Sequence, residues 1–341
     1  MMKKHLATLV FCLSSLVSFA QAGTTVFSGI NVFGSARVAA LGGNAIALCE
    51  NDINTAAINP ALIDSLMNRK LAMSYVRYYG QSNFGYTSYG FHPAKSKFAF
   101  AGTLQYFGYG ESERLDGLGN NLGTFTSNEY ALTLGASYKV DSLWKVGLNL
   151  KNLYSVFDTY YSYGIAVDAA ATYFQPRKNF AASFVLKNVG MQLVTYRESS
   201  REKLPLEFQI GISKRPKNAP FLFHLTYENV QKWNVKFTDP NATIVVDPLT
   251  GLPVEDRTWE FGDLFMRHIV LGTEIILGNN FRIGLGYNYR QRKELAIPNR
   301  PATAGISLGT TVNFKKFQLS YGRSIYHVAG GSNHITITTQ L

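Results

Sequence analysis

From residue 70 onward the chain alternates apolar and polar residues with a period of two, and no other feature restricts its possible folds as strongly. In residues 281–289, for example, every odd position is Phe, Ile, Leu or Tyr, and every even position is Arg, Gly or Asn. Such alternation is typical of strands with one apolar and one polar face. It predicts fourteen strands, at 71–79, 83–91, 97–108, 129–139, 143–155, 161–174, 180–189, 204–214, 220–230, 265–277, 281–290, 303–313, 316–325 and 334–341.

The connections between these strands alternate in length. Short links follow the even-numbered strands, and longer ones follow the third, seventh, ninth, eleventh and thirteenth; the short links at 80–82 and 156–160 are exceptions. A soluble β-sandwich shares the strand pattern but has no reason to sort its loops in this way. The sequence therefore predicts an all-β fold, a 14-stranded antiparallel transmembrane β-barrel, closed because strand edges cannot stay unpaired in lipid. An even strand count puts both termini on the side of the short turns, which is the periplasm in such barrels.

The N-terminus carries the features of an export signal. Lys3 and Lys4 precede an apolar stretch at 6–19, and Ala20-Gln21-Ala22 has the form of a cleavage site, with cleavage after Ala20 as an alternative. We therefore expect a signal peptide at 1–22, an N-terminal plug segment at 23–68 and a barrel at 69–341.

Composition agrees with export to an outer membrane. Charged residues make up only 16% of the chain, and the mean hydropathy is −0.04, which does not suit a bundle of membrane helices. The net charge of +11 could indicate nucleic-acid binding, but for an exported protein outer-membrane lipid and lipopolysaccharide are the better partners. Only Cys49 remains after removal of the signal, so no internal disulfide is expected.

Catalytic and metal-binding patterns are not found in the sequence. The histidines lack helical ligand spacing, there is no paired-cysteine motif, and there is no Gly-x-Ser-x-Gly elbow. His224 and His268 fall within predicted strands as isolated polar side chains. We therefore expect a protein that is not an enzyme and needs no metal or cofactor.

A motif of small residues precedes the first strand. It runs from Ser35 through Arg37 to Gly42, Gly43 and Ala47, and continues with Asp52-Ile53-Asn54 and Asn59-Pro60-Ala61-Leu62. We expect a helix in 35–48 broken at the Gly pair, and a second turn in 53–62 ended by Asn59-Pro60. This motif resembles the N-terminal signature of the FadL-like barrels, in which such a segment plugs or lines the lumen of fourteen strands.

Within that superfamily, the Ala-Arg-x-Ala-Ala-Leu-Gly-Gly-Asn form and its spacing to Asn59-Pro60 most resemble the PorQ family of the type IX secretion system. The resemblance implies a non-enzymatic barrel that holds a PorZ-like surface protein beside PorU-like and PorV-like members of a complex. That complex processes exported cargo and joins it to lipopolysaccharide. One departure is the final Leu341, where many outer-membrane barrels end in an aromatic residue.

The longest predicted loop, 231–264, contains two of the three Trp residues and Arg257. Trp and Arg dominate binding hot spots, so this loop suits a partner surface. A lid over the barrel mouth is an equal alternative. The function can then be an anchor for a surface partner, a FadL-like transporter of hydrophobic molecules, or a shuttle for cargo. A transporter needs an apolar pocket that connects to a gap in the wall. The residues chosen as partner-binding candidates are Trp233, Arg257 and Trp259 in this loop, with Arg197, Arg201 and Arg292 in neighbouring loops.

Overall fold

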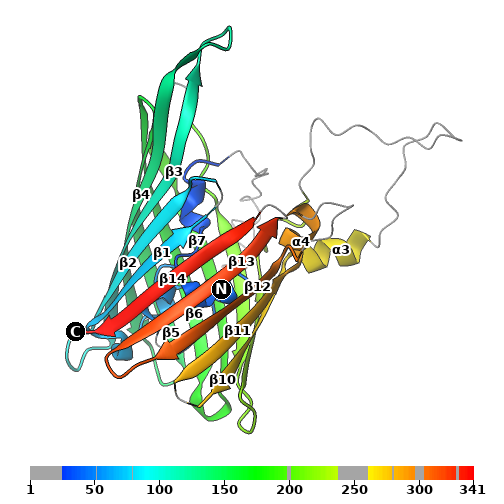
Figure 1. The fold of residues 1–341 in the computed structure, drawn as a ribbon. Helices are drawn as coiled ribbons and strands as arrows, with labels where there is room; N and C mark the ends of the chain where they lie inside the picture. The colour runs from blue at the N-terminus through cyan, green and yellow to red at the C-terminus, as the bar shows by residue number, and fades with distance from the viewer. Residues whose placement is uncertain are drawn as a thin grey trace, which may run out of the picture.

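The computed structural model describes residues 25–341 apart from 51, 79, 198–200, 237–259, 279, 296–302 and 328–329. The predicted signal peptide lies outside this part of the chain. Fourteen antiparallel strands form one closed barrel, in which each strand pairs with its neighbours in sequence and β1 pairs with β14 (Figure 1). The strands are β1 (Lys70–Arg77), β2 (Asn83–Phe91), β3 (Phe98–Leu115), β4 (Asn121–Lys139), β5 (Trp144–Phe157), β6 (Tyr160–Gln175), β7 (Phe180–Val194), β8 (Glu207–Lys214), β9 (Phe221–Tyr227), β10 (Ile269–Leu277), β11 (Phe281–Asn288), β12 (Ile306–Asn313), β13 (Phe317–His327) and β14 (Gly330–Gln340).

The faces of the wall are inverted relative to a soluble protein. Side chains that point outward are large, apolar and exposed, whereas those that point into the barrel are polar or small and buried. An apolar outer surface that continues around a whole barrel is typical of a wall that faces lipid. Exposed outward side chains include Met73, Leu104, Leu134, Leu148, Leu150, Val167, Ile210, Leu308, Ile335 and Ile337. In the part of the chain that is described, no helix is long and apolar enough to cross a membrane.

The predicted strand positions are confirmed, and several of their boundaries are corrected. The predicted loop 109–128 is mostly strand, because β3 and β4 continue as a paired hairpin that projects beyond the rest of the wall (Figure 1). The predicted strand starts at 204, 265 and 303 are too early, since β8, β10 and β12 begin at Glu207, Ile269 and Ile306. Helix α3 (Glu260–Arg267) fills the residues before β10, and helix α4 (Tyr289–Leu295) follows β11 directly.

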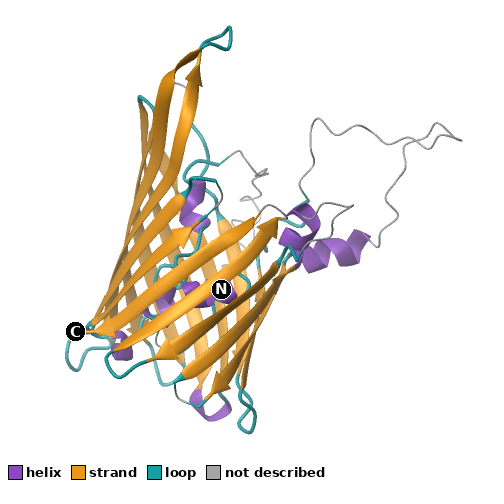
Figure 2. Ribbon diagram, viewed as in Figure 1, coloured by secondary structure: helices purple, strands orange, loops and turns teal. Residues whose placement is uncertain are grey.

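Most of the described residues between 26 and 68 lie inside the barrel, where Figure 2 shows short helical turns enclosed by the wall. Five turns divide this segment: η1 (Ser28–Asn31), α2 (Ala36–Ala40), η2 (Ile53–Thr55), η3 (Pro60–Leu62) and η4 (Ser65–Met67). The predicted break at the Gly pair is confirmed, because Gly42 and Gly43 adopt φ of 95° and 92° and end α2 after one turn. The predicted helix does not resume in 44–48, so it is shorter than expected. Asn59-Pro60 begins η3 rather than only ending the turn before it, since the Asn59 side chain accepts a hydrogen bond from the backbone N–H of Ala61.

Candidate functional site: the plugged lumen and its outer mouth

The plug, residues 26–68, is joined to the wall by a buried cluster of four charged side chains. Arg37 donates two hydrogen bonds to the carboxylate of Glu274 on β10, from Nε to Oε1 at 2.8 Å and from Nη2 to Oε2 at 2.7 Å. Arg37 also donates to Glu50 at 2.6 Å, and Arg282 on β11 donates to both carboxylates. Two arginines thus balance two glutamates, and this pairing offsets the cost of removing Arg37 and Glu274 from water, whereas Glu50 and Arg282 stay 20% and 22% exposed.

The same cluster sets the protonation of the one plug carboxylate in it. Burial by itself raises the pKa of Glu50, but the adjacent charges of Arg37 and Arg282 outweigh burial and lower the pKa to about 2. Glu50 is therefore ionised near neutral pH and carries the charge that pairs with both arginines.

The Gly pair brings the plug backbone against the wall. A methyl group added at Gly286 on β11 would lie 2.0 Å from the backbone nitrogen of Gly42, so only glycine fits at this wall position. On β9, which is separated from β11 by β10, the Nε2 atom of His224 is 2.9 Å from the carbonyl oxygen of Leu41. The wall and the plug backbone are therefore in direct contact at Gly286, whereas at β9 the His224 side chain joins them.

The second half of the motif is fixed on the opposite side of the lumen. Asn59 donates to the carbonyl oxygen of Ile46 at 2.7 Å and to the Thr172 hydroxyl of β6 at 3.2 Å. A methyl group added at Gly147 of β5 would lie 2.4 Å from the carbonyl carbon of Pro60. Arg37, Gly42, Gly43, Asn59 and Pro60, the predicted plug residues, therefore all contact the wall or shape the plug against it.

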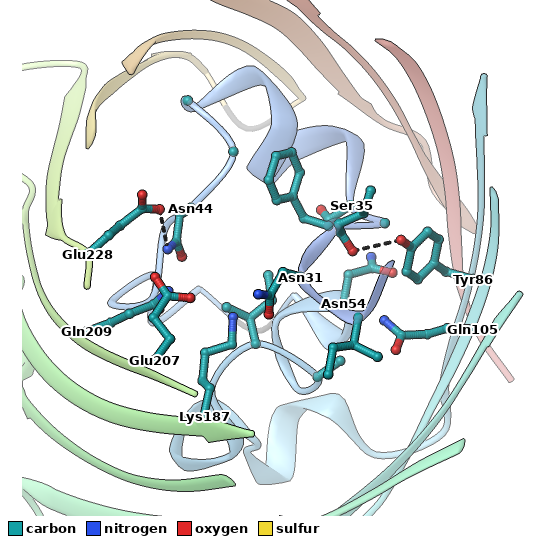
Figure 3. A pocket seen from close by; sticks show the side chains of 18 of the residues that line it. Asn31, Ser35, Asn44, Asn54, Tyr86, Gln105, Lys187, Glu207, Gln209 and Glu228 are labelled. Atoms are coloured by element: carbon teal, nitrogen blue, oxygen red, sulfur yellow. Dashed lines mark hydrogen bonds between the residues drawn. The ribbon is translucent and has the colours of Figure 1, made fainter. Parts of the chain in front are cut away.

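A cavity of about 270 Å³ lies between the plug and the loop end of the barrel (Figure 3). Its lining is mainly polar: Glu207, Gln209, Glu228 and Asn44 gather on one side, and Tyr86, Gln105 and Asn54 lie opposite. Asn44 of the plug donates to Glu228 at 2.7 Å. Burial, followed by the charge of Glu207, raises the pKa of the Glu228 carboxyl. The polar lining of the cavity therefore does not favour the binding of a hydrophobic molecule.

Two helices rim the mouth beside β9–β11. The helices α3 and α4 are joined by the Tyr289 hydroxyl, which donates to Asp263 at 2.9 Å, and by the pair Arg267–Glu294 at 3.6 Å. Trp233 packs against Phe261 of α3, with ring centroids 5.2 Å apart. Phe261 is 65% exposed, so this aromatic pair is open to a neighbour.

The partner-binding candidates are only partly brought together. Trp233 and Arg292 belong to the segments around α3 and α4, whereas Arg197 and Arg201 are exposed in the connection between β7 and β8. The guanidinium of Arg197 lies 5.7 Å from the ring centre of Tyr160 on β6. Arg257 and Trp259 lie outside the described residues, so their prediction stays untested.

Sequence reasoning missed the two wall members of the charged cluster around Arg37. Glu274 and Arg282 occupy inward positions of adjacent strands, and a charged residue at an inward position of an otherwise apolar strand is the signal that could have identified them. Their meeting with the plug depends on the register of the closed barrel, which the alternation pattern does not specify.

Comparison with known proteins bears on the fold. No protein-family model matches the sequence, and no curated protein matches it significantly. Among solved structures, the CymD monoaromatic hydrocarbon channel superimposes with a TM-score of 0.52 at 17% identity, covering 91% of this chain and 98% of that one. A FadL homologue from Pseudomonas aeruginosa gives a TM-score of 0.50 at 10% identity, covering 90% and 98%. At such identities the likeness concerns the fold, and the chain has the fold of the FadL-like, fourteen-stranded outer-membrane β-barrels.

Proposed function

We propose that this protein is a non-enzymatic outer-membrane anchor of the PorQ type. In this proposal the barrel holds a PorZ-like surface protein through its long outer loops, within a type IX secretion complex that contains PorU-like and PorV-like members. The short turns and both termini face the periplasm. The observation that carries the proposal is that a plug fills the lumen and is bound to the wall through the Arg37–Glu274 pair.

A fixed plug suits an anchor better than a conduit. The contacts that hold it are distributed around the barrel: Ser324 of β13 donates to the carbonyl oxygen of Ala39 at 3.0 Å, Ser213 of β8 to Ala47 at 2.7 Å, and Ser137 of β4 to Ile63 at 2.7 Å. Opening the lumen would break many of these bonds together. The sequence resemblance of the motif from Ser35 to Leu62 adds the type of complex and the partner.

The mouth supplies a surface for such a partner. Trp233 and Phe261 form an exposed aromatic pair at the base of the long connection between β9 and β10. Aromatic side chains bury large areas at little conformational cost, which makes them frequent anchors of protein interfaces.

The second candidate is a transporter of hydrophobic small molecules. It is favoured by the fold, because one of the similar structures is described as a monoaromatic hydrocarbon channel. The polar lining of the cavity above the plug, with Glu207, Glu228 and Lys187, argues against an apolar substrate in the lumen. We therefore rank the anchor first.

Purification of the tagged full chain from gently solubilised outer membrane separates the two candidates. The anchor predicts near-stoichiometric recovery of a PorZ-like surface protein, and loss of that protein when residues 237–259 are replaced by a short Gly-Ser linker. Replacing residues 116–120, at the tip of the β3–β4 hairpin, is the matched control and should leave the complex intact. Recovery of the barrel alone, with a bound hydrophobic molecule detected by mass spectrometry, would contradict the anchor and favour transport.

A further inference from the structure

The lipid-facing wall carries an apolar groove of about 490 Å³ across β8, β9, β10 and β11. Two rows of paired, outward-facing residues line it. The pairing of the strands places Ile212, Leu225, Leu271 and Tyr287 in one row, and Lys214, Phe223, Thr273 and Leu285 in the next.

The groove exists because a small side chain lies among large ones. Thr273 pairs with Phe223 on one side and with Leu285 on the other, so the wall is lower at Thr273 than around it. Phe223, Leu271 and Leu285 are each between 39% and 49% exposed and form the apolar sides. A flexible hydrocarbon chain fits such a depression, because it can bury methylene groups against all three.

One end of the groove is strongly basic. Lys214 lines the groove, and its Nζ donates to the carbonyl oxygen of Lys178 at 2.6 Å, which joins the β8–β9 turn to the β6–β7 turn. The two turns contain no acidic residue, and their cations form no ion pair within the described chain. The cations of this basic cluster are Arg177, Lys178, Lys214, Arg215 and Lys217.

We infer that the groove and the basic cluster form a binding site for an anionic phospholipid. An acyl chain lies over Thr273 between Phe223 and Leu285, and the phosphate lies against Lys214 and the adjoining turns. The inference rests on the orientation in the proposed function, in which these turns face the periplasm and therefore the phospholipid leaflet. A soluble anion would leave the groove empty, and an apolar molecule would leave the cations without a counter-charge.

Native mass spectrometry of the full chain in mild detergent, titrated with phosphatidylglycerol, tests this site. We expect one tightly bound lipid per barrel. The triple variant Lys214→Ala/Arg215→Ala/Lys217→Ala should weaken binding at least tenfold. Thr273→Phe should weaken it comparably, because the larger side chain fills the groove while every cation is still present.

The chain offers a control with the same charge change. The control residues are Lys95, Lys97 and Lys139, which lie at two other adjacent turns, and none of them lines the groove. The backbone N–H of Lys139 donates to the carbonyl oxygen of Lys97 and joins these turns. Replacing all three with Ala should leave phosphatidylglycerol binding unchanged. Thermal melting of each variant shows whether the barrel is intact.

The inference would be overturned if phosphatidylethanolamine and phosphatidylglycerol bound equally and neither groove variant changed their binding. The bound lipid would then be the non-specific lipid that surrounds any membrane barrel. Preferential binding of lipopolysaccharide at the same residues would overturn both the inference and the periplasmic placement of the turns. If the groove variants lose the lipid but still recover the PorZ-like partner, the site is confirmed independently of the anchoring function. If the lipid binds and no partner is recovered, only the anchoring function fails.

Discussion

Arg37 and Glu274 form a two-point ion pair between residues that are 237 positions apart in the chain, one in the plug and one in the wall. Both side chains are almost fully buried, with 5% and 2% of their surface exposed. A buried pair of this kind costs most when only one member is removed, because the other is left charged and unpaired.

Replacing Arg37 with Ala should therefore destabilise the protein strongly. We expect a loss of about 3–5 kcal/mol in the free energy of unfolding. Urea denaturation of the purified protein in detergent, followed by tryptophan fluorescence, measures the change. The control is Arg114→Ala, which removes a more exposed pair between Arg114 on the projecting hairpin and Asp158 in the β5–β6 turn, and it should cost about 0–1 kcal/mol. Equal effects of the two substitutions would show that the plug cluster contributes no more than a surface pair.

The pH dependence of stability should reflect Glu50. Its pKa is lowered to about 2, against about 4.3 in an unfolded chain, so its stabilising contribution is complete above pH 4.3 and is lost as the pH falls toward 2. The urea midpoint should therefore fall between pH 5 and pH 2.5. Glu50→Gln should flatten this dependence, and Glu113→Gln, at an exposed position, should not. A Glu50→Gln variant with the original pH dependence would contradict the pairing.

Gly286→Ala should displace the plug without changing the wall strands. The added methyl group would lie 2.0 Å from the backbone nitrogen of Gly42, so the contact between plug and wall must open. We expect a large rise in proteolysis of residues 26–68 under native conditions. Gly85→Ala is the matched control, because nothing lies within 4 Å of a methyl group added there. Unchanged protection of the plug in Gly286→Ala would mean that the plug backbone does not rest on β11.

The thiol of Cys49 reports on opening of the plug in the unmodified chain. Burial raises its pKa to about 11, so little thiolate is present at pH 8, and a maleimide should react slowly with the native protein and rapidly in urea. An exposed thiol, in Cys49→Ser/Ser112→Cys, is the positive control. Rapid labelling of native Cys49 would show that the plug opens on the timescale of the reaction.

The sequence specified the barrel well because lipid imposes one rule on every spanning strand. Outward residues such as Leu148 and Ile337 must be apolar, so the alternation marks each strand position. The rule does not apply where the wall extends beyond the membrane. Glu111 and Glu113 belong to strand β3, yet water surrounds both faces of the projecting hairpin, and no apolar alternation is needed there.

The plug motif was located correctly, but its contacts were not. Gly42 and Pro60 mark local turns, which depend on neighbouring residues and can be read from sequence. The pairing of Arg37 with Glu274 depends on the stagger of fourteen strands around a closed ring, and no local pattern contains that quantity.

The fit between plug and wall has a consequence for how the protein is made. The plug leads directly into β1, its helix α2 touches β11 to β14, and η3 touches β4 to β6, so both early and late strands meet the same short segment. In a barrel that closed first, all of these contacts would have to form inside a wall that was already complete. We therefore expect the sheet to curl around the N-terminal segment before β1 and β14 join. Substitutions that disrupt the plug should then cause slow maturation and degradation of the protein during membrane insertion, rather than leakage through the outer membrane.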